Sequence, residues 1–130
     1  HLQLKTAITP NVDLSCDPDK LERVVDNLIR NAISYSYPDT VISLGMHATE
    51  DNAVLTICNA GRTISPEKLN RIFEQFFRGD TSRSTATGGA GLGLAIAKQI
   101  TEMHGGTIQA ESRDEHIRFT VTLPLRQKIV

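Results

Sequence analysis

A run of glycines that leads straight into a helix start is the most restrictive feature of this sequence. The run Gly88–Leu94 merges with apolar residues at helical spacing, which are Leu92, Ala95, Ile96, Ile100 and Met103. Free N–H groups and the positive end of the helix dipole at such a start suit a phosphate group. A flexible linker is the alternative, but it does not explain the abrupt entry into the helix. The run is neither a P-loop nor a dinucleotide-binding turn, because GxxxxGKS/T is absent and Ile96 takes the place of the third glycine of GxGxxG.

The rest of the chain predicts one α/β domain over residues 1–130, an ordinary length for a single domain. Polar and apolar residues alternate in residues 1–16 on both sides of Pro10, which indicates two short strands joined by a turn. Asp17-Pro18 then starts a helix that should end near Tyr35. The other expected elements are strands at 40–47, 53–59, 107–112 and 116–125, a helix from Ser65 that carries Leu69, Ile72 and Phe73, and a helix from Leu92 that ends at Gly105-Gly106. The small and polar segment 79–91 is expected to form a mobile loop.

Composition excludes several classes of function. The formal net charge is -1, with 14 basic and 15 acidic residues, so the basic excess that nucleic acid or an anionic membrane surface requires is absent. We therefore expect no nucleic acid partner and no direct membrane contact. No apolar run approaches the roughly 20 residues of a membrane span. Cys16 and Cys58 lie far apart in apolar stretches, so we expect both to be small buried residues rather than metal ligands, which fits a reducing cytoplasm. The histidines have no metal-ligand spacing.

Asn27 and Asn31 lie four residues apart and therefore share one face of the first predicted helix. Because Leu21, Leu28 and Ala32 are expected to face the core, the two amides should lie beside the apolar stripe at the edge of a pocket. Amide oxygens in that position can bind Mg²⁺ while leaving room for phosphate oxygens and water. Taken alone, the pair is more simply explained as two half-exposed polar residues.

Asn59-Ala60-Gly61 follows a strand that is expected to be buried. A short polar side chain at the end of such a strand can face a flat heterocycle, and Gly61 lets the backbone approach closely. An ordinary turn that contains asparagine is the alternative.

The segment Phe73–Arg78 leads into the expected loop. An arginine at the edge of a mobile segment, Arg78 or Arg83 within the loop, could reach a terminal phosphate. Phe73 is equally compatible with simple core packing, whereas Phe76 or Phe77 is expected to anchor the loop.

Taken in this order, these segments resemble the histidine-kinase branch of the family that also contains the gyrase, MutL and heat-shock chaperone ATPases. Asn27–Ile33 resembles its N box, Asn59–Gly61 its first glycine box, Phe73–Arg78 its F box and Gly89–Gly93 its second glycine box. The resemblance implies a two-layer α/β sandwich, the Bergerat fold, with a mixed sheet of about five strands packed under three helices and a mobile ATP lid.

The resemblance also implies a role for individual residues, carried over by their position in each box. Asn31 would ligate Mg²⁺ with help from Asn27, Asn59 would contact the adenine amine, and Arg78 would contact the γ-phosphate. The residues expected to bind ATP are Asn27, Asn31, Tyr35, Asn59, Gly61, Ile64, Phe76, Arg78, Gly89, Gly91, Leu92 and Gly93. The implied cofactors are ATP and Mg²⁺, and the residues with an implied catalytic role are Asn27, Asn31 and Arg78.

The sequence departs from the family's pattern in several places. Asn59 replaces the usual aspartate, and we expect weaker ATP binding because a charge-assisted hydrogen bond is about twice as strong as a neutral one. Thr63 replaces the second glycine of the same box, Ser34 stands where lysine is common, and Ala90 replaces a frequent hydroxyl residue. Hydrolytic members carry a glutamate as general base at position 27, but Asn27 cannot take a proton near neutral pH. The pocket is therefore expected to hold ATP for transfer rather than for hydrolysis.

The implied function is that of a sensor histidine kinase, which transfers the γ-phosphoryl group to a histidine on a separate dimerisation domain. An acceptor histidine is followed by an acidic residue and then a proline, and none of the chain's histidines has this context; these are His1, His47, His104 and His116. The isolated chain is therefore expected to be incompetent for autophosphorylation.

Because it begins with His1, we expect it to be part of a longer protein. That protein would be a homodimeric membrane sensor with this domain in the cytoplasm, and its partner would be the receiver domain of a response regulator. The isolated domain would be a monomer.

Asn59 together with the run Ile72–Asp80 is similar to the VanS group of glycopeptide-resistance sensors. Two alternatives remain open. Asn59, Thr63 and Ser34 motivate a degenerate module of the same fold that acts only through protein contacts. A serine kinase of the anti-sigma-factor type shares the fold and would transfer phosphate to a serine on a partner protein.

Overall fold

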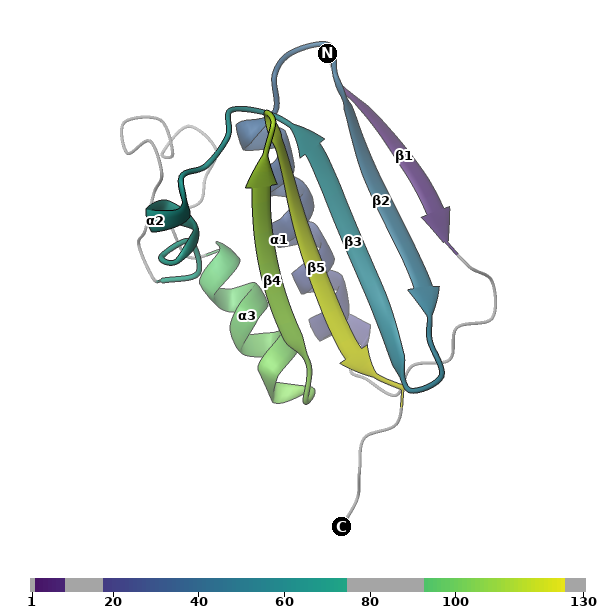
Figure 1. The fold of residues 1–130 in the computed structure, drawn as a ribbon. Coiled ribbons are helices and arrows are strands. Elements are labelled where there is room, and N and C mark those ends of the chain that lie inside the picture. Colours follow the sequence, from purple (N-terminus) through teal and green to yellow (C-terminus); the bar gives the residue numbers. More distant parts are fainter. Residues whose placement is uncertain (1, 9–17, 75–92, 126–130) are drawn as a thin grey trace.

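A mixed five-stranded sheet is the centre of the structure, a computed structural model that describes residues 2–8, 18–74 and 93–125 of the chain (Figure 1). The strands are β1 (Gln3–Ile8), β2 (Val41–Ala48), β3 (Asn52–Ala60), β4 (Thr107–Arg113) and β5 (His116–Pro124). Their order across the sheet is β1-β2-β3-β5-β4. β1 pairs with β2 in parallel, and the other neighbouring strands are antiparallel. β2 and β3 form an antiparallel hairpin that turns around residues 50–52.

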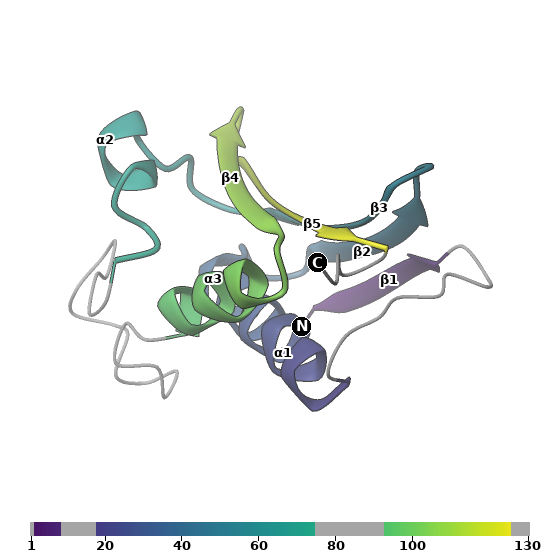
Figure 2. The ribbon, with the colours of Figure 1, turned by 90° about the horizontal axis from the view of Figure 1, so that it is seen from below.

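The helices are α1 (Pro18–Tyr35), α2 (Pro66–Leu69) and α3 (Gly93–Met103). α1 and α3 pack side by side and cover one face of the sheet, whereas α2 lies beyond the β4 edge (Figure 2). This arrangement is the two-layer α/β sandwich that the sequence predicts. Among the described residues, no helix combines the length and apolar character needed to cross a bilayer.

The core lies between the helices and the two central strands. Every second residue of β3 and β5 is buried, and the buried residues pair across the strands as Ala53 with Leu123, Leu55 with Val121, Ile57 with Phe119, and Asn59 with Ile117. Alternation with a period of two places these side chains on the face that the helices cover. Asn59 is the only polar member of this set, and it lies at the end of the buried row.

α1 presents a narrow apolar stripe to the sheet. Pro18 is its first residue, where a missing N–H costs nothing, and Val24, Leu28 and Ala32 are each no more than 2% exposed. These three residues are four apart, so they lie one above another on the helix. The residues beside the stripe are therefore held at the border between core and solvent.

α3 ends as the sequence predicts. Gly105 adopts the left-handed conformation with φ of 78°, and its N–H donates to the carbonyl of Glu102. The N–H of Gly106 donates to the carbonyl of Thr101, which completes a Schellman motif. Gly106 also packs so closely on β5 that a Cβ there would overlap the carbonyl of Thr122. The glycine pair therefore fixes the turn from α3 into β4.

α2 is shorter than predicted, because the regular helix stops after one turn. Ser65 caps it by accepting from the N–H of Lys68, and the following N–H groups of Arg71 and Ile72 donate to carbonyls only three residues back. Ile72 is nevertheless buried, and Phe73 packs edge-on against Phe119 with ring centroids 5.9 Å apart. The structure supports core packing for Phe73, one of the two readings that the sequence left open, but Ile72 and Phe73 lie in turns rather than in a continued helix.

Other expectations lie outside the described residues or are met only in part. The second short strand before residue 17 and the loop at 79–91 are outside the described residues, as is Cys16. Cys58 is a free thiol and is half-buried rather than fully buried. Burial raises the pKa of the Cys58 thiol, which keeps it protonated near neutral pH.

Candidate functional site

Three of the predicted site residues form a row along α1. Asn27, Asn31 and Tyr35 are spaced four apart, so they share one helix face, and each is half-buried beside the apolar stripe. At 1.5 Å per residue the row is about 12 Å long. The structure therefore brings these residues together in the linear arrangement that the helical spacing predicts.

The Asn27 end of the row meets the start of α3. A Cβ built on Gly93 would lie 3.7 Å from Oδ1 of Asn27, which is ordinary contact distance. The first N–H groups of an α-helix have no carbonyl partner within the helix, so the start of α3 is a favourable place for a phosphate group. Nδ2 of Asn27 is buried and has no hydrogen-bond partner among the residues that the structure describes. This end of the row thus combines a helix start with the amide oxygen and the unused Nδ2 donor of Asn27.

The Tyr35 end of the row meets the segment after β3. The N–H of Tyr37 donates to the carbonyl of Ala60 over 2.9 Å, and Ser36 forms a β-bridge with Gly61. A Cβ on Gly61 would overlap the carbonyl oxygen of Tyr35. Because φ of Gly61 does not lie in the left-handed region, space rather than backbone conformation requires glycine here.

Asn59 lies next to this contact. It is only 3% exposed and follows Ile57 on the helix-covered face of β3. Its Nδ2 has no hydrogen-bond partner in the described part of the chain and lies 3.1 Å from where a Cβ of Gly61 would be. A buried amide donor without a partner costs free energy, so Asn59, like Asn27, has a donor that a ligand would satisfy.

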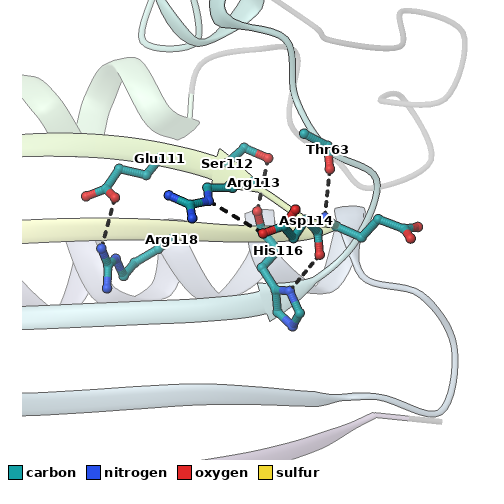
Figure 3. A network of polar contacts seen from close by, with 8 residues as sticks. Thr63, Glu111, Ser112, Arg113, Asp114, His116 and Arg118 are labelled. Carbon is teal, nitrogen blue, oxygen red and sulfur yellow. Dashed lines mark hydrogen bonds and ion pairs between the residues drawn. The ribbon is translucent and has the colours of Figure 1, made fainter.

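The loop after Gly61 is tied to the turn between β4 and β5 (Figure 3). Oγ1 of Thr63 accepts from the N–H of Glu115 at 2.7 Å (Figure 3). The N–H of Gly61 donates to the carbonyl of Glu115 at 3.0 Å. The N–H of Ile64 donates to Oγ of Ser112, and this hydroxyl donates to the carbonyl of His116. The hydroxyl of Thr63 therefore holds the loop at the position where the family has a glycine.

Tyr37 joins the same turn through its side chain. Its hydroxyl donates to Oε2 of Glu115 over 2.6 Å, and this hydrogen bond is the main cause that raises the pKa of Tyr37. Both turn residues, Asp114 and Glu115, have positive φ, with values of 52° and 62°. The hairpin turn thus presents its backbone to the loop that carries Gly61 and the carboxylate of Glu115 to Tyr37.

Sequence reasoning missed Tyr37, Ser112 and Glu115, which position this loop. The short polar pair Asp114-Glu115 between two strand patterns does indicate a tight turn. What the turn touches is not visible in the sequence, because Glu115 bonds to residues 52 and 78 positions earlier.

The predicted site residues divide into two groups. The structure brings together Asn27, Asn31, Tyr35, Asn59, Gly61 and Gly93, and it places Ile64 against the core beside them. Phe76, Arg78, Gly89, Gly91 and Leu92 lie outside the described residues.

Comparison with known proteins identifies the family. The family described as histidine kinase-, DNA gyrase B-, and HSP90-like ATPase matches residues 16–127. The chain is 48% identical over 124 residues to sensor protein VanSC of Enterococcus gallinarum, covering 95% of the chain and 34% of that sensor. It is 45% identical over 120 residues to sensor protein VanS of Enterococcus faecium, covering 92% of the chain and 31% of that sensor. The chain thus spans about a third of the length of these relatives.

A solved structure gives the same result for the fold. The mycobacterial sensor histidine kinase MprB superposes with a TM-score of 0.84 at 29% identity, over 98% of this chain and 86% of that one. Sequence and fold agree over nearly the whole chain. The chain therefore belongs to the histidine kinase-, DNA gyrase B- and HSP90-like ATPase family, in which it is a sensor histidine kinase ATPase domain with VanS-type sensors among its relatives.

Proposed function

We propose that the chain binds Mg-ATP and supplies the γ-phosphoryl group for autophosphorylation of a histidine on a separate dimerisation domain. One observation carries this proposal: the row Asn27-Asn31-Tyr35 joins the start of α3 to the segment Asn59–Gly61. A helix start suits phosphate and the end of a buried strand suits a flat base, so the two ends match the two ends of a nucleotide.

The base would lie at the Tyr35 end. Asn59 supplies an amide without a partner, and Gly61 leaves the space beside it free of a side chain. Tyr35 and Ile64 both pack partly against the core and would line this end. Asn59 would hydrogen-bond the exocyclic group of the base.

The phosphates would lie at the Asn27 end, close to Gly93 and the first turn of α3. Mg²⁺ prefers oxygen ligands and retains several waters, so the amide oxygens of Asn31 and Asn27 fit it. When bound, Mg²⁺ would neutralise charge on the phosphoryl oxygens. Asn27 cannot act as a general base, which favours holding ATP for transfer over rapid hydrolysis.

Further roles rest on the resemblance alone. Arg78 would reach the γ-phosphate and complete the catalytic set with Asn27 and Asn31. The remaining residues proposed to frame the nucleotide are Phe76, Gly89, Gly91 and Leu92.

The partners follow from the same function. The intact protein would be a homodimeric membrane sensor whose cytoplasmic part contains this domain. Phosphate would pass from the dimerisation domain to the receiver domain of a response regulator. The chain alone would be a monomer that binds nucleotide but cannot phosphorylate itself.

Calorimetric titration with a non-hydrolysable ATP analogue, with and without Mg²⁺, tests the proposal. We expect saturable binding that Mg²⁺ tightens, and we expect Asn31→Ala to abolish the Mg²⁺-dependent part while the circular dichroism spectrum is unchanged. Asn70→Ala is the matched control, because Asn70 is exposed at the end of α2 and should leave binding intact. Normal Mg²⁺-dependent binding by Asn31→Ala would refute the site. Absence of binding at millimolar analogue would favour the degenerate module instead.

A further inference from the structure

Asn59 has a donor that nothing in the described part of the protein uses. The side chain is 3% exposed, it continues the buried row of β3, and its Nδ2 has no hydrogen-bond partner. The neighbouring backbone is already engaged, since the carbonyl of Ala60 and the N–H of Gly61 both make hydrogen bonds to other segments. A ligand is therefore the natural source of an acceptor for Nδ2.

An amide differs from a carboxylate in what it can recognise. An ionised aspartate offers only acceptors, so it can pair with the 6-amino group of adenine but repels a 6-oxo group. The amide of Asn59 offers one donor group and one acceptor side by side. In one orientation the oxygen accepts from a 6-amino group and Nδ2 donates to N1 of the ring. Turned over, Nδ2 donates to a 6-oxo group and the oxygen accepts from the N1–H.

Neither a side chain at position 61 nor a hydrogen bond from the described residues holds the Asn59 amide in one orientation. Position 61 is a glycine, so no side chain lies beside Nδ2, although the carbonyl of Tyr35 approaches from α1. No hydrogen bond from the described residues fixes Nδ2 toward one side. The element that would exclude a 6-oxo group, a fixed negative charge, is absent at this position.

From these observations we propose that the base subsite at Asn59 accepts 6-oxopurine nucleotides, those of hypoxanthine and guanine, as well as adenine nucleotides. This inference rests on the proposed function, because it assumes that the base lies against Asn59. The residue at position 59 then determines which purine bases bind, and asparagine admits more of them than aspartate would.

The test compares the affinities of the chain for Mg-ATP, Mg-ITP and Mg-GTP by calorimetry. ITP differs from ATP at the position that Asn59 would contact, and GTP adds a 2-amino group that tests room elsewhere. For the unmodified chain we expect the dissociation constants of ITP and ATP to agree within about threefold. For Asn59→Asp we expect ATP to bind more tightly and ITP more weakly. The ratio of the ITP to the ATP dissociation constant should therefore be about tenfold or more larger than in the unmodified chain. Asn70→Asp adds the same charge away from the site and should leave the ratio unchanged.

Each outcome decides between distinct conclusions. If the unmodified chain binds ATP but binds ITP about thirtyfold or more weakly, this inference is overturned and the proposed function still stands. If Asn59→Asp has the same ratio of the ITP to the ATP dissociation constant as the unmodified chain, Asn59 is not the residue that discriminates between the bases. Failure of all three nucleotides to bind would overturn the proposed function itself, and this inference with it. The comparison in the unmodified chain stays decisive even if Asn59→Asp does not fold.

Discussion

Gly61 is where two segments of the site approach each other most closely. Its position leaves no space for a Cβ, because that atom would overlap the carbonyl of Tyr35 and crowd Nδ2 of Asn59. Backbone atoms cannot move aside as a flexible side chain can, so α1 and β3 must separate. We expect Gly61→Ala to lower the free energy of unfolding by about 1–3 kcal/mol, as overpacking commonly does, and to weaken nucleotide binding.

Urea unfolding followed by circular dichroism measures the first effect. Gly93→Ala is the control for stability, since a Cβ there makes only ordinary contact with Asn27, and its cost should stay within about 0.5 kcal/mol. Equal stability losses in the two variants would contradict the close approach at Gly61.

Residues of the site were predictable from the sequence to different extents. The shared face of Asn27, Asn31 and Tyr35 follows from helical spacing alone, and the structure agrees. The burial of Asn59 follows from the alternation in β3. Its unpaired donor could not be predicted, because that depends on every neighbour that the fold brings near.

At the scale of elements, the β4–β5 turn supports the loop that carries Gly61. Thr63 accepts a 2.7 Å hydrogen bond from the backbone N–H of Glu115 across 52 residues. We expect Thr63→Val, which keeps the shape but removes the acceptor, to lower the free energy of unfolding by about 0.5–1.5 kcal/mol. A looser loop should also weaken nucleotide binding by about threefold or more in calorimetry.

Thr49 provides a matched control for that prediction. Its Oγ1 accepts from the N–H of Asn52 at 3.1 Å in the β2–β3 turn, at the opposite end of β3 from Asn59. Thr49→Val should therefore reduce stability by a similar amount without changing nucleotide affinity. If both variants bind nucleotide equally well, the β4–β5 turn has no role in positioning the site.

Elements with both a boundary signal and a regular pattern were predicted best. α1 has Pro18 at its start and one apolar stripe, and α3 has its glycine pair at the end, so both agree with the sequence. α2 was predicted too long because Ile72 and Phe73 continue a helical spacing while lying in turns. Periodicity indicates which residues face the core, and Phe73 does contact Phe119 there, but it does not fix the backbone conformation that carries them.

At the scale of the whole molecule, the site draws on all parts of the sandwich. α1 carries its row of residues, α3 its phosphate end, and β3 with the β4–β5 turn its base end. The order of helical and strand patterns predicted an α/β domain, and the family resemblance implied the two-layer sandwich. The order β3-β5-β4 within the sheet came only from the structure, since strand pairing is not local information.

Because every layer contributes to the site, nucleotide should stabilise the whole fold rather than one segment. A ligand that binds only the folded state at a free concentration of about 100 times its dissociation constant adds about 2.7 kcal/mol to the free energy of unfolding. We therefore expect saturating Mg-ATP to raise the free energy of unfolding by this amount. In urea unfolding this appears as a higher midpoint concentration, with an unchanged m-value and a single transition. Tyrosine absorbance reports on Tyr35 in the site and circular dichroism reports on the backbone of the whole fold, so a single cooperative unit should give the same midpoint with both probes. Asn31→Ala should shift the midpoint less, and by the same amount with and without Mg²⁺. A shift seen by one probe alone would mean that the site and the sheet unfold separately, so that the chain does not behave as one cooperative unit.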